Sequence, residues 1–495
     1  MAVDVPVTAP HVVMAVANPI VTDARVRKTA ASVRALGYKV TLLWADNASS
    51  VVTEGEMAGV RTLGLPVPYY LRTRSLAAMG QRARPPSPWF RVGYRDAAQR
   101  RVKAAQLAAR RARLNTDQEP AALRFAALVH RLRAKALSVR LDRHQRRYEN
   151  WRRGLSWDRE LAIVADLDGV FGPWFDKLEP DVLHMHDVHL LSAAVHAKRR
   201  LTARGKPPIL IYDAHEYVRG MEGGNPFWEA GYAAMERELA PEADAFITVS
   251  EPIADRLVTE LDLPTRPSVV LNTPYLQAGK DLEAGPDLRT SLGLAPDVPL
   301  VAYAGVLHAN RNLVPLIEAF GLLQGVHLAL VCVPNAHYSV AAGLGEHAAK
   351  LGLSDRVHLI DPVAPAQVVR FLSTAWVGVH PMATGFPNHE MALPNKLFDY
   401  LWAGLPVAVS QVKAMADLVN SAGAGTTFNP EDPQSIASAI KRVLEDREQF
   451  AAAARDPGLK ARFAWEAQAK KLAQLYAQVA PLGTPASNAE RDLAQ

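Results

Sequence analysis

The fold is decided by the stretch HVVMAVANPIVTDARVRKTAASVRALGYKVTLLW, residues 11–44. Two apolar runs, 11–17 and 38–44, flank a segment whose apolar residues recur at helical spacing. Thr22 or Asp23 can cap the start of that helix. A strand, a helix and a second strand in this order predict the beginning of a parallel α/β sheet.

The same alternation continues along most of the 495 residues. We predict further strands at 181–187, 208–216, 245–250, 299–304, 326–333, 356–360, 376–380 and 406–410. A connection rich in Gly, Pro and Asp lies between Tyr275 and Pro299, so we expect two α/β domains that face a cleft, over 1–275 and 276–457. A helix over 458–480 and a loose tail over 481–495 complete the expected organisation.

Residues 70–160 interrupt this pattern with Ala-, Arg- and Leu-rich segments of helical periodicity, which predict a helical insertion in the first domain. Residues 71–160 hold 23 Lys and Arg against 7 Asp and Glu, whereas the whole chain carries a formal charge of +6. Tryptophans are interleaved with this charge, so one interpretation is an anionic membrane surface as a partner. The alternative is a solvated helical face or an oligomer contact. We expect no nucleic-acid partner, since no recognisable binding module accompanies the charge.

Composition and missing motifs exclude several classes of protein. The single cysteine, Cys332, rules out a disulfide within one chain. A secretion signal and an apolar run of 18 residues are both missing, so we expect a cytoplasmic protein, peripheral at the inner face of the membrane if the basic insertion binds lipid. There is also no GxGxxG after the first strand, no GxxxxGK[ST] and no GxSxG, which argues against dinucleotide oxidoreductases, P-loop enzymes and α/β-hydrolases.

The stretch AGVLHANRNL, 304–313, follows a predicted strand with residues suited to an anion. Ligands of open parallel sheets bind beyond the carboxyl ends of the strands. Gly305 permits close approach of the backbone, Asn312 can cap the next helix, and Arg311 can share an anion with the positive end of that helix. The alternative is an ordinary surface arginine in a turn.

A second stretch, ALPNKLFDYLWAGLPVAVS at 392–410, has the same layout. Pro394 suits a helix start, which leaves free N–H groups near Asn395 and Lys396 for a phosphate. Asp399 lies one turn later, where its carboxylate can accept hydrogen bonds from two ribose hydroxyls. The alternative is a well-capped helix with a solvated aspartate.

The stretch YDAHE, 212–216, places His215 at the rim of the first domain, where an imidazole can act near neutral pH. His184, His186 and His189 have spacing close to that of metal ligands, but only Asp187 lies between them, and we expect no metal site. The pair of aspartates in Asp166-Leu167-Asp168 falls in a helical pattern, which argues against a carboxylate-bound metal.

Taken together, these motifs resemble the GT-B glycosyltransferases, in particular glycosyltransferase family 4. The resemblance covers roughly 11–65 and 160–480 and rests on TDARVRKTAASVRALGYKVTLL, DVLHMHD, YDAHE, SVVLNTP, AYAGVL, LPNKLFDYLWAGLPVAVS and AWEAQAKKLAQLY. It implies two Rossmann-like domains, with a nucleotide sugar on the C-terminal one, an acceptor on the N-terminal one, and a final helix that crosses back to the first domain.

The resemblance also implies roles for individual residues. Asp399 corresponds to the carboxylate that binds the ribose, and Arg311 to the basic residue that binds the donor diphosphate. His215 corresponds to the rim histidine near the donor sugar. Two positions depart from the family pattern. Met391 replaces the first of two paired acids, with Glu390 out of register, and Val306 replaces an arginine after Gly305. We expect Lys396 to supply the missing charge.

The resulting prediction is a retaining, metal-independent, hexosyltransferase-like enzyme without a cofactor. Its donor substrate would be linked to UDP, GDP or dTDP, and its acceptor would be lipid-linked or a polysaccharide. The catalytic residues would be His215 and Arg311, and Gly305, Arg311, Asn395, Lys396 and Asp399 would bind the donor. Two alternatives stay open, a nucleotide-sugar epimerase and a non-catalytic scaffold on the same fold.

Overall fold

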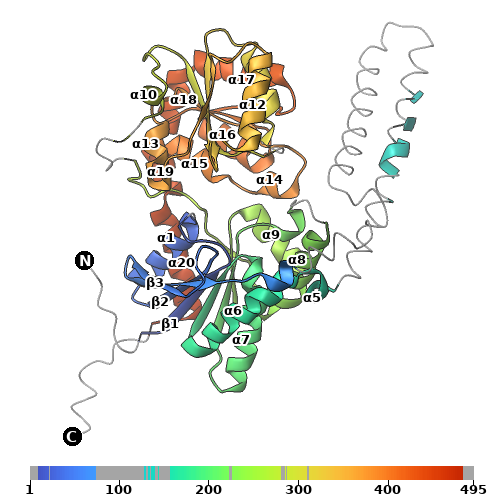
Figure 1. The fold of residues 1–495 in the computed structure, drawn as a ribbon, viewed down its shortest axis with the longest axis vertical. Helices are drawn as coiled ribbons and strands as arrows, with labels where there is room; N and C mark the ends of the chain where they lie inside the picture. Colours follow the sequence, from blue (N-terminus) through green and yellow to red (C-terminus); the bar gives the residue numbers. More distant parts are fainter. Residues whose placement is uncertain are drawn as a thin grey trace.

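The computed structural model describes residues 9–21, 23–73, 156–221, 226–279, 285, 287–308 and 311–482, with short pieces between 128 and 143. Most of the basic insertion expected at 70–160 therefore lies outside the described residues, as does the tail beyond 482. The described chain forms two α/β domains, one above the other in Figure 1. In the part that the structure describes, no helix has the length and apolarity needed to span a bilayer.

The first domain is built on an eight-stranded sheet of order β3-β4-β2-β1-β5-β6-β7-β8, parallel except for the β3–β4 pair. Its strands are β1 His11–Val16, β2 Lys39–Asp46, β3 Thr53–Met57, β4 Val60–Pro66, β5 Val182–His186, β6 Ile209–Ala214, β7 Ala245–Thr248 and β8 Ser268–Val269. Its helices are α1 Ala24–Ala35, α5 Trp157–Glu160, α6 Ala162–Leu178, α7 Leu191–Ala203, α8 Pro226–Leu239 and α9 Glu251–Leu261. The two faces of the sheet bury separate apolar clusters.

The second domain is built on a six-stranded parallel sheet of order β11-β10-β9-β12-β13-β14. Its strands are β9 Leu300–Val306, β10 His327–Val333, β11 Val357–Ile360, β12 Val377–His380, β13 Val407–Ser410 and β14 Gly425–Phe428. Its helices are α10 Leu288–Ser291, α11 Leu313–Phe320, α12 Ser339–Lys350, α13 Val368–Leu372, α14 Pro387–Met391, α15 Asn395–Trp402, α16 Lys413–Ala422, α17 Pro433–Glu445, α18 Arg447–Ala454 and α19 Pro457–Phe463. The prediction of two Rossmann-like α/β domains is confirmed.

The opening stretch folds as its pattern predicts. Asp23 accepts a hydrogen bond at 3.1 Å from the backbone N–H of Val26, which satisfies one of the free donors at the start of α1. After α1, Gly37 adopts a φ of +106°, which an L side chain rarely tolerates. Strand β2 then pairs in parallel with β1, with Lys39 opposite His11.

Both sheets reverse their strand order at one point, between β1 and β5 in the first domain and between β9 and β12 in the second. Loops on either side of such a point leave in opposite directions, and a crevice opens at the carboxyl ends of the strands. The topology therefore provides one ligand crevice in each domain.

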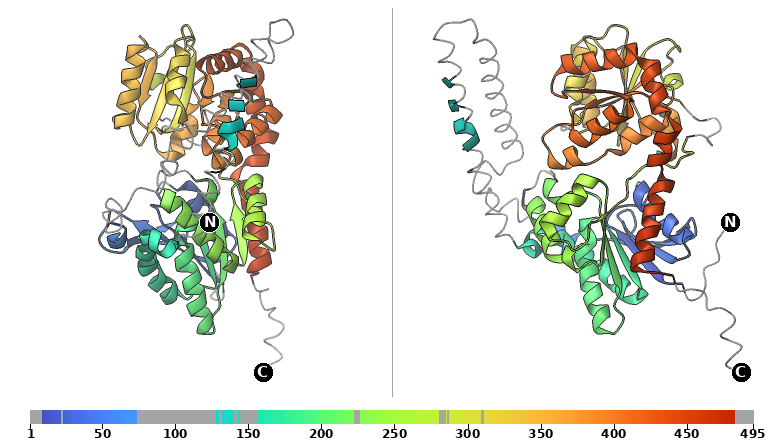
Figure 2. Two further views of the ribbon diagram at one scale, coloured as in Figure 1. Left: turned by 90° about the vertical axis from the view of Figure 1, so that its right-hand side faces the viewer. Right: turned by 180° about the vertical axis from the view of Figure 1, so that it is seen from behind.

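The end of the chain differs from the single helix expected at 458–480. Residues 457–479 form α19 and α20, Trp465–Val479, with a break at Ala464, whose extended ψ of 152° no α-helix can contain. Helix α19 packs on the core of the second domain, whereas α20 runs along the first (Figure 2). The Trp465 indole donates to Ser32 Oγ at 3.0 Å, and the Tyr476 hydroxyl lies 2.8 Å from His184 Nδ1.

Several elements were not expected. The strands β3, β4, β8 and β14 were not predicted. Strands β8 and β14 are short, β3 has the polar sequence TEGEM, and the sequence VRTLGLP of β4 contains no long apolar run. The expected cap of α11 is also wrong in detail. Asn312 precedes that helix in a left-handed conformation, with φ of 45°, and its side chain does not accept from the helix.

Candidate active site

A cleft of about 530 Å³ lies between the two domains. The first domain contributes α1, through residues such as Lys28, and residues 272–275, where the connection between the domains begins, also line the cleft. The second domain contributes the carboxyl ends of β9 and β10, the segment 362–372 and the start of α15. The cleft thus lies at the crevice that the strand order of the second sheet creates.

Four of the predicted donor-binding residues lie on the wall of this cleft, namely Gly305, Asn395, Lys396 and Asp399. Asn395 and Lys396 open α15, whose first N–H groups have no side-chain cap. Lys396 Nζ lies 3.1 Å from Asp399 Oδ2, so the two charges pair on one face of the helix. The helix start offers backbone donors and the positive end of a dipole to an anion in the cleft.

Lys28 reaches the cleft from the opposite domain. Its ammonium donates to Asn272 Oδ1 at 2.9 Å and to the Thr273 carbonyl at 2.5 Å, and it lies 4.6 Å from the centroid of the Trp465 ring. Burial, followed by the nearby charge of Arg25, lowers the pKa of Lys28 to about 7. No role for this lysine could be predicted from the sequence, because its position depends on the packing of α1 against the connection between the domains.

Arg311 is not part of the cleft wall, but it lies on the loop that follows Gly305. Among the described residues, its Nη1 atom is buried without a hydrogen-bond partner. The same holds for both ring nitrogens of His380, at the end of β12, and for Nδ2 of Asn312. Burial, and then the charges of Arg311 and Lys396, lower the pKa of His380 to about 3, so the three side chains belong to one neighbourhood.

His215 lies outside this cleft, in a buried network at the carboxyl end of β6. Arg25 of α1 makes a two-pronged ion pair with Asp213, at 2.7 and 3.0 Å, and also donates to the Val270 carbonyl at 2.6 Å. The Nε2 atom of His215 lies 3.4 Å from Asp213 Oδ2 and 3.2 Å from His186 Nδ1. The network therefore fixes one ring nitrogen of His215 and leaves Nδ1 for another partner.

Burial and the neighbouring charges shift the pKa values of this network in opposite directions. Burial alone would raise the pKa of Asp213, but Arg25 and then His215 hold it well below its usual range. Burial alone would lower the pKa of His215, but the Asp213 carboxylate outweighs it and raises that pKa. The pKa of His186 falls to about 3, through burial and the neighbouring His184. His215 is thus the ring of this network best suited to carry a proton.

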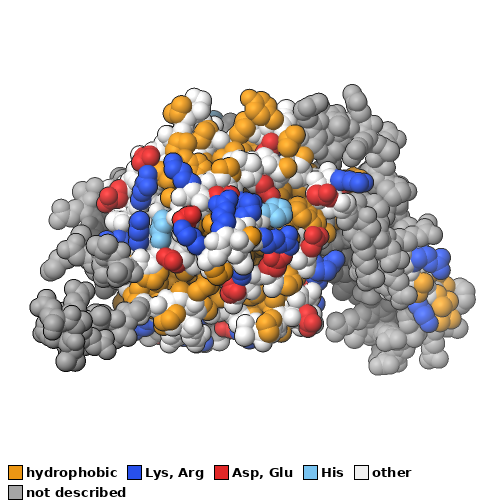
Figure 3. Space-filling model, turned by 90° about the horizontal axis from the view of Figure 1, so that it is seen from below, with side chains coloured by type: hydrophobic (Ala, Val, Ile, Leu, Met, Phe, Trp, Pro, Cys, Tyr) orange, Lys and Arg blue, Asp and Glu red, His pale blue; other side chains and the backbone are white. Residues whose placement is uncertain are grey.

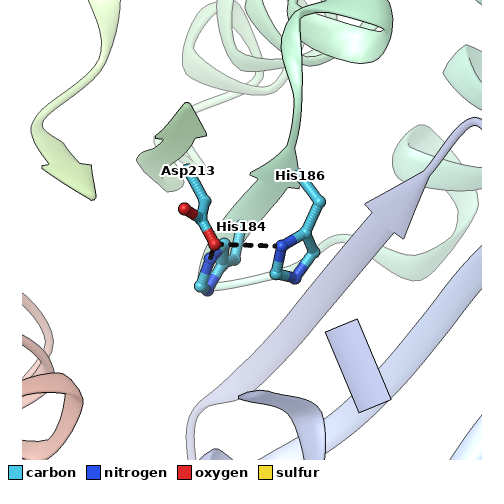
Figure 4. Close-up of side chains that lie close together, drawn as sticks. All are labelled: His184, His186 and Asp213. Atoms are coloured by element: carbon cyan, nitrogen blue, oxygen red, sulfur yellow. Dashed lines mark ion pairs between the residues drawn. The ribbon is translucent and has the colours of Figure 1, made fainter. Parts of the chain in front are cut away.

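His184, His186 and Asp213 come close enough to hold a metal ion in principle, with potential ligand atoms within 4.8 Å of one another (Figure 4). Asp187, the only carboxylate between His184 and His189 in the sequence, instead faces His189, at 3.4 Å. Arg25 already occupies both oxygens of Asp213. A cation would have to displace or sit beside that guanidinium, so we interpret the trio as part of the charge network.

The two departures from the family pattern have visible consequences. The side chain of Met391 packs against the apolar core of the first domain. Glu390 accepts from the backbone N–H groups of Gly385 and Lys413, both at 2.9 Å, so its carboxylate holds loops together. Val306 is 54% exposed at the position after Gly305. Neither Glu390 nor Val306 supplies a charge to the cleft.

Two Rossmann-like domains that face a cleft, with a helix returning from the second domain to the first, define the GT-B class of fold. Two family models match the chain, "Glycosyltransferase Family 4" over residues 128–274 and "Glycosyl transferases group 1" over 298–446. Together they cover more than half of its length. The chain belongs to the GT-B glycosyltransferases and is similar to family 4.

Curated relatives agree with this assignment. A D-inositol 3-phosphate glycosyltransferase of Xylanimonas cellulosilytica is 25% identical over 50% of this chain and 60% of its own length. A protein of the same name from Thermobispora bispora is 27% identical over 60% of this chain and 70% of its own. The match to the Xylanimonas protein thus spans less than two thirds of that relative.

Solved structures share the fold at low sequence identity. The sucrose-phosphate synthase of Thermosynechococcus elongatus has a TM-score of 0.63 and 15% identity, and the match covers 95% of this chain and 98% of that one. The trehalose-6-phosphate enzyme of E. coli, solved with UDP-2-fluoro glucose, has a TM-score of 0.59 and 13% identity, with 95% and 100% covered.

Proposed function

We propose that this protein transfers a sugar from a nucleoside-diphosphate sugar to an acceptor, with the donor in the cleft between the domains. The observation that carries the proposal is the arrangement of polar groups around that cleft. Asp399 and the uncapped start of α15 line it, and the buried, unpartnered Arg311 Nη1 lies on the loop after Gly305. The name of the E. coli relative, with its bound UDP-sugar, supports the same class of donor.

Transfer of the sugar requires that the negative charge on the leaving diphosphate be stabilised. Negative charge grows on the phosphate as the anomeric carbon acquires oxocarbenium character, and preorganised donors in a poorly hydrated site stabilise it best. Arg311 and the N–H groups of Asn395 and Lys396 would hold the diphosphate, and Asp399 would accept from the ribose. We propose that this occurs without a metal ion, since these groups supply the positive charge.

His215 would act at the donor sugar. Its Nε2 atom is held by Asp213 and His186, which leaves Nδ1–H to donate to a sugar hydroxyl or to the phosphate. We propose retention of the anomeric configuration, as the resemblance to family 4 implies. No residue is assigned as a covalent nucleophile.

The acceptor would bind to the first domain. We propose a lipid-linked or polysaccharide acceptor and peripheral action at the inner face of the membrane, on the basis of the charge of residues 71–160. On the face in Figure 3, by contrast, basic and acidic side chains are interspersed. Along α7, Lys198 pairs with Asp244, Arg199 with Glu242 and Arg200 with Asp176. The basic insertion is therefore the segment to test for lipid binding.

A panel of nucleotides tests the donor site. Thermal unfolding of the full chain would be followed with UDP, GDP and dTDP and with the corresponding nucleotide sugars. We expect the nucleotides of one base to raise the unfolding temperature, and we expect Asp399→Ala to abolish that rise. Asp417→Ala is the matched control, since Asp417 is an exposed acid of the same domain, outside the cleft.

The outcome separates the alternatives. A wild-type chain that responds to no nucleotide would contradict the transferase and favour a scaffold. Release of free sugar, or conversion of the donor to its epimer without any acceptor, would favour a nucleotide-sugar epimerase. If Lys396→Ala leaves donor affinity unchanged, the role of Lys396 as the substitute charge is wrong.

A further inference from the structure

A second cavity, of about 410 Å³, lies within the first domain. Its wall follows the carboxyl ends of three neighbouring strands: residues 16–19 after β1, Asn47 after β2, and Asp187 and His189 after β5. This is the point at which the order of the first sheet reverses, so the topology favours a ligand here. None of the expected site residues lines this cavity.

Three aromatic side chains, Tyr69, Trp228 and Tyr232, line the cavity. Tyr69 and Trp228 flank the guanidinium of Arg72, whose carbon lies 5.3 and 5.8 Å from the two ring centroids. The backbone N–H of Arg72 donates to Asp166 Oδ2 at 2.8 Å, which fixes the start of this segment. The Tyr232 ring packs edge-on against His189, with ring centroids 4.9 Å apart. Rigid aromatic rings with a polar edge suit a ligand that is apolar on its faces and polar at its rim.

The charges of the cavity are balanced. Among the described lining residues, Arg72 and His189 oppose Asp187 and Glu229. The His189 ring lies 3.4 Å from Asp187 Oδ2, and Arg72 is engaged with two rings. Phosphate sites in proteins use clustered guanidinium groups that can bond in pairs. A phosphate here would instead meet two carboxylates and a single guanidinium, whose carbon lies 5.3 and 5.8 Å from the centroids of two aromatic rings.

A residue that lines the cavity is joined to His215 by backbone and side-chain contacts. Asp187 follows β5 directly, and its backbone N–H donates to the Asp213 carbonyl at 2.9 Å. Asp213 in turn holds His215. A ligand in the cavity would therefore lie on the same sheet edge as the histidine that we place at the donor sugar.

We propose that this cavity binds an uncharged pyranose ring of the acceptor, with Trp228 as its stacking platform and the Asp187–His189 pair as the partner of a hydroxyl. This inference rests on the proposed function, because it names the class of acceptor for the same reaction. The C–H faces of a pyranose lie on aromatic rings, while Asn47, Asp187 and Glu229 offer hydrogen bonds to its hydroxyls. A phosphorylated sugar is the class that the charge balance disfavours.

The test titrates the full chain, with and without its nucleotide, using glucose, galactose, mannose and N-acetylglucosamine, followed by glucose 6-phosphate and inositol 3-phosphate. Binding would be measured by saturation-transfer NMR and calorimetry. We expect at least one neutral sugar to bind and the phosphorylated compounds to bind about tenfold more weakly. Trp228→Leu should weaken the neutral sugar about tenfold by removing the stacking surface. Trp228→Phe should keep most of the affinity.

Trp174→Leu is the matched control, since Trp174 is also half-buried on the first domain but stacks with Lys177 outside the cavity. The inference is wrong if no neutral sugar binds, if the phosphorylated compounds bind more tightly, or if Trp228→Leu binds as the wild type does. The nucleotide response is measured on the same samples. Its presence in a chain that binds no sugar would reject only this inference, whereas its absence would reject the proposed function.

Discussion

Two clusters of buried polar groups, one in each domain, differ in how their charges are paired. At the end of β6 in the first domain, Arg25, His186 and His215 all lie against the Asp213 carboxylate, although Nε2 of His186 has no partner among the described residues. At the end of β12 in the second, both ring nitrogens of His380 are buried without a partner among the described residues, and a nitrogen of Arg311 is too. We interpret the first arrangement as part of the fold and the second as polar groups that are held for the donor.

This difference predicts how mutations in each cluster change the free energy of unfolding. Removing one member of a buried ion pair leaves an uncompensated charge, whereas removing an unpartnered buried polar group relieves a desolvation penalty. Mutations in the two regions should therefore have opposite effects on the stability of the ligand-free protein. A site that holds polar groups ready without partners is preorganised for its ligand.

The largest effect is expected for Asp213→Ala, which leaves the Arg25 guanidinium buried and unpaired. We expect a loss of about 3–5 kcal/mol in the free energy of unfolding, measured by urea denaturation. The control is Glu54→Ala, which breaks an exposed pair with Arg61 and should cost less than about 1 kcal/mol. Equal losses in the two variants would mean that the network does not stabilise the fold.

A smaller loss is expected for Tyr476→Phe. The Tyr476 hydroxyl is the partner of His184 Nδ1, at 2.8 Å, and joins α20 to the network. Its removal leaves a buried ring nitrogen unsatisfied, which should cost about 1–3 kcal/mol in the same denaturation experiment. An unchanged midpoint would show that this hydrogen bond does not contribute to the stability of the protein.

For His380→Leu, we expect the free energy of unfolding to rise, not to fall as in the two variants above. The leucine fills a similar volume without orphaned nitrogens, so the ligand-free protein should gain about 1 kcal/mol in the free energy of unfolding. Donor affinity, measured by calorimetry, should fall in the same variant. A loss of stability without ligand would contradict the description of His380 as unsatisfied.

The smallest expected effects are changes with pH in the stability difference between a variant and the wild type. The raised pKa of His215 gives stability that is fully present below pH 6.5 and is lost as the pH rises through the pKa of the folded state. His215→Asn should therefore lower the free energy of unfolding more at pH 5.5 than at pH 8.5. The pKa of His380, lowered to about 3, takes stability away as the pH falls below 6.5. His380→Leu should therefore gain more at pH 5 than at pH 8. Parallel pH profiles for both variants would contradict the two opposite shifts.

The sequence predicts more of the fold than of the site. Long apolar runs identify the inner strands of both sheets to within one or two residues, because burial on both faces leaves little room for polar residues. Gly305 and Asp399 could be assigned to a cleft because ligands bind at strand ends. The ion pair between Arg25 and Asp213, 188 residues apart, leaves no local signal in the sequence. The exposure of Lys28 to the cleft likewise depends on how α1 meets the connection between the domains.

The central claim, that a diphosphate is held by Arg311 and the start of α15, is tested most directly by calorimetry. The affinity of the full chain for the preferred nucleoside diphosphate would be compared with that for the nucleoside alone, in the wild type and in Arg311→Ala. We predict that the wild type binds the diphosphate at least about tenfold more tightly than the nucleoside, as expected for charge-assisted hydrogen bonds. Arg311→Ala should lose most of that difference. Equal affinity for the two ligands in the wild type would contradict the account.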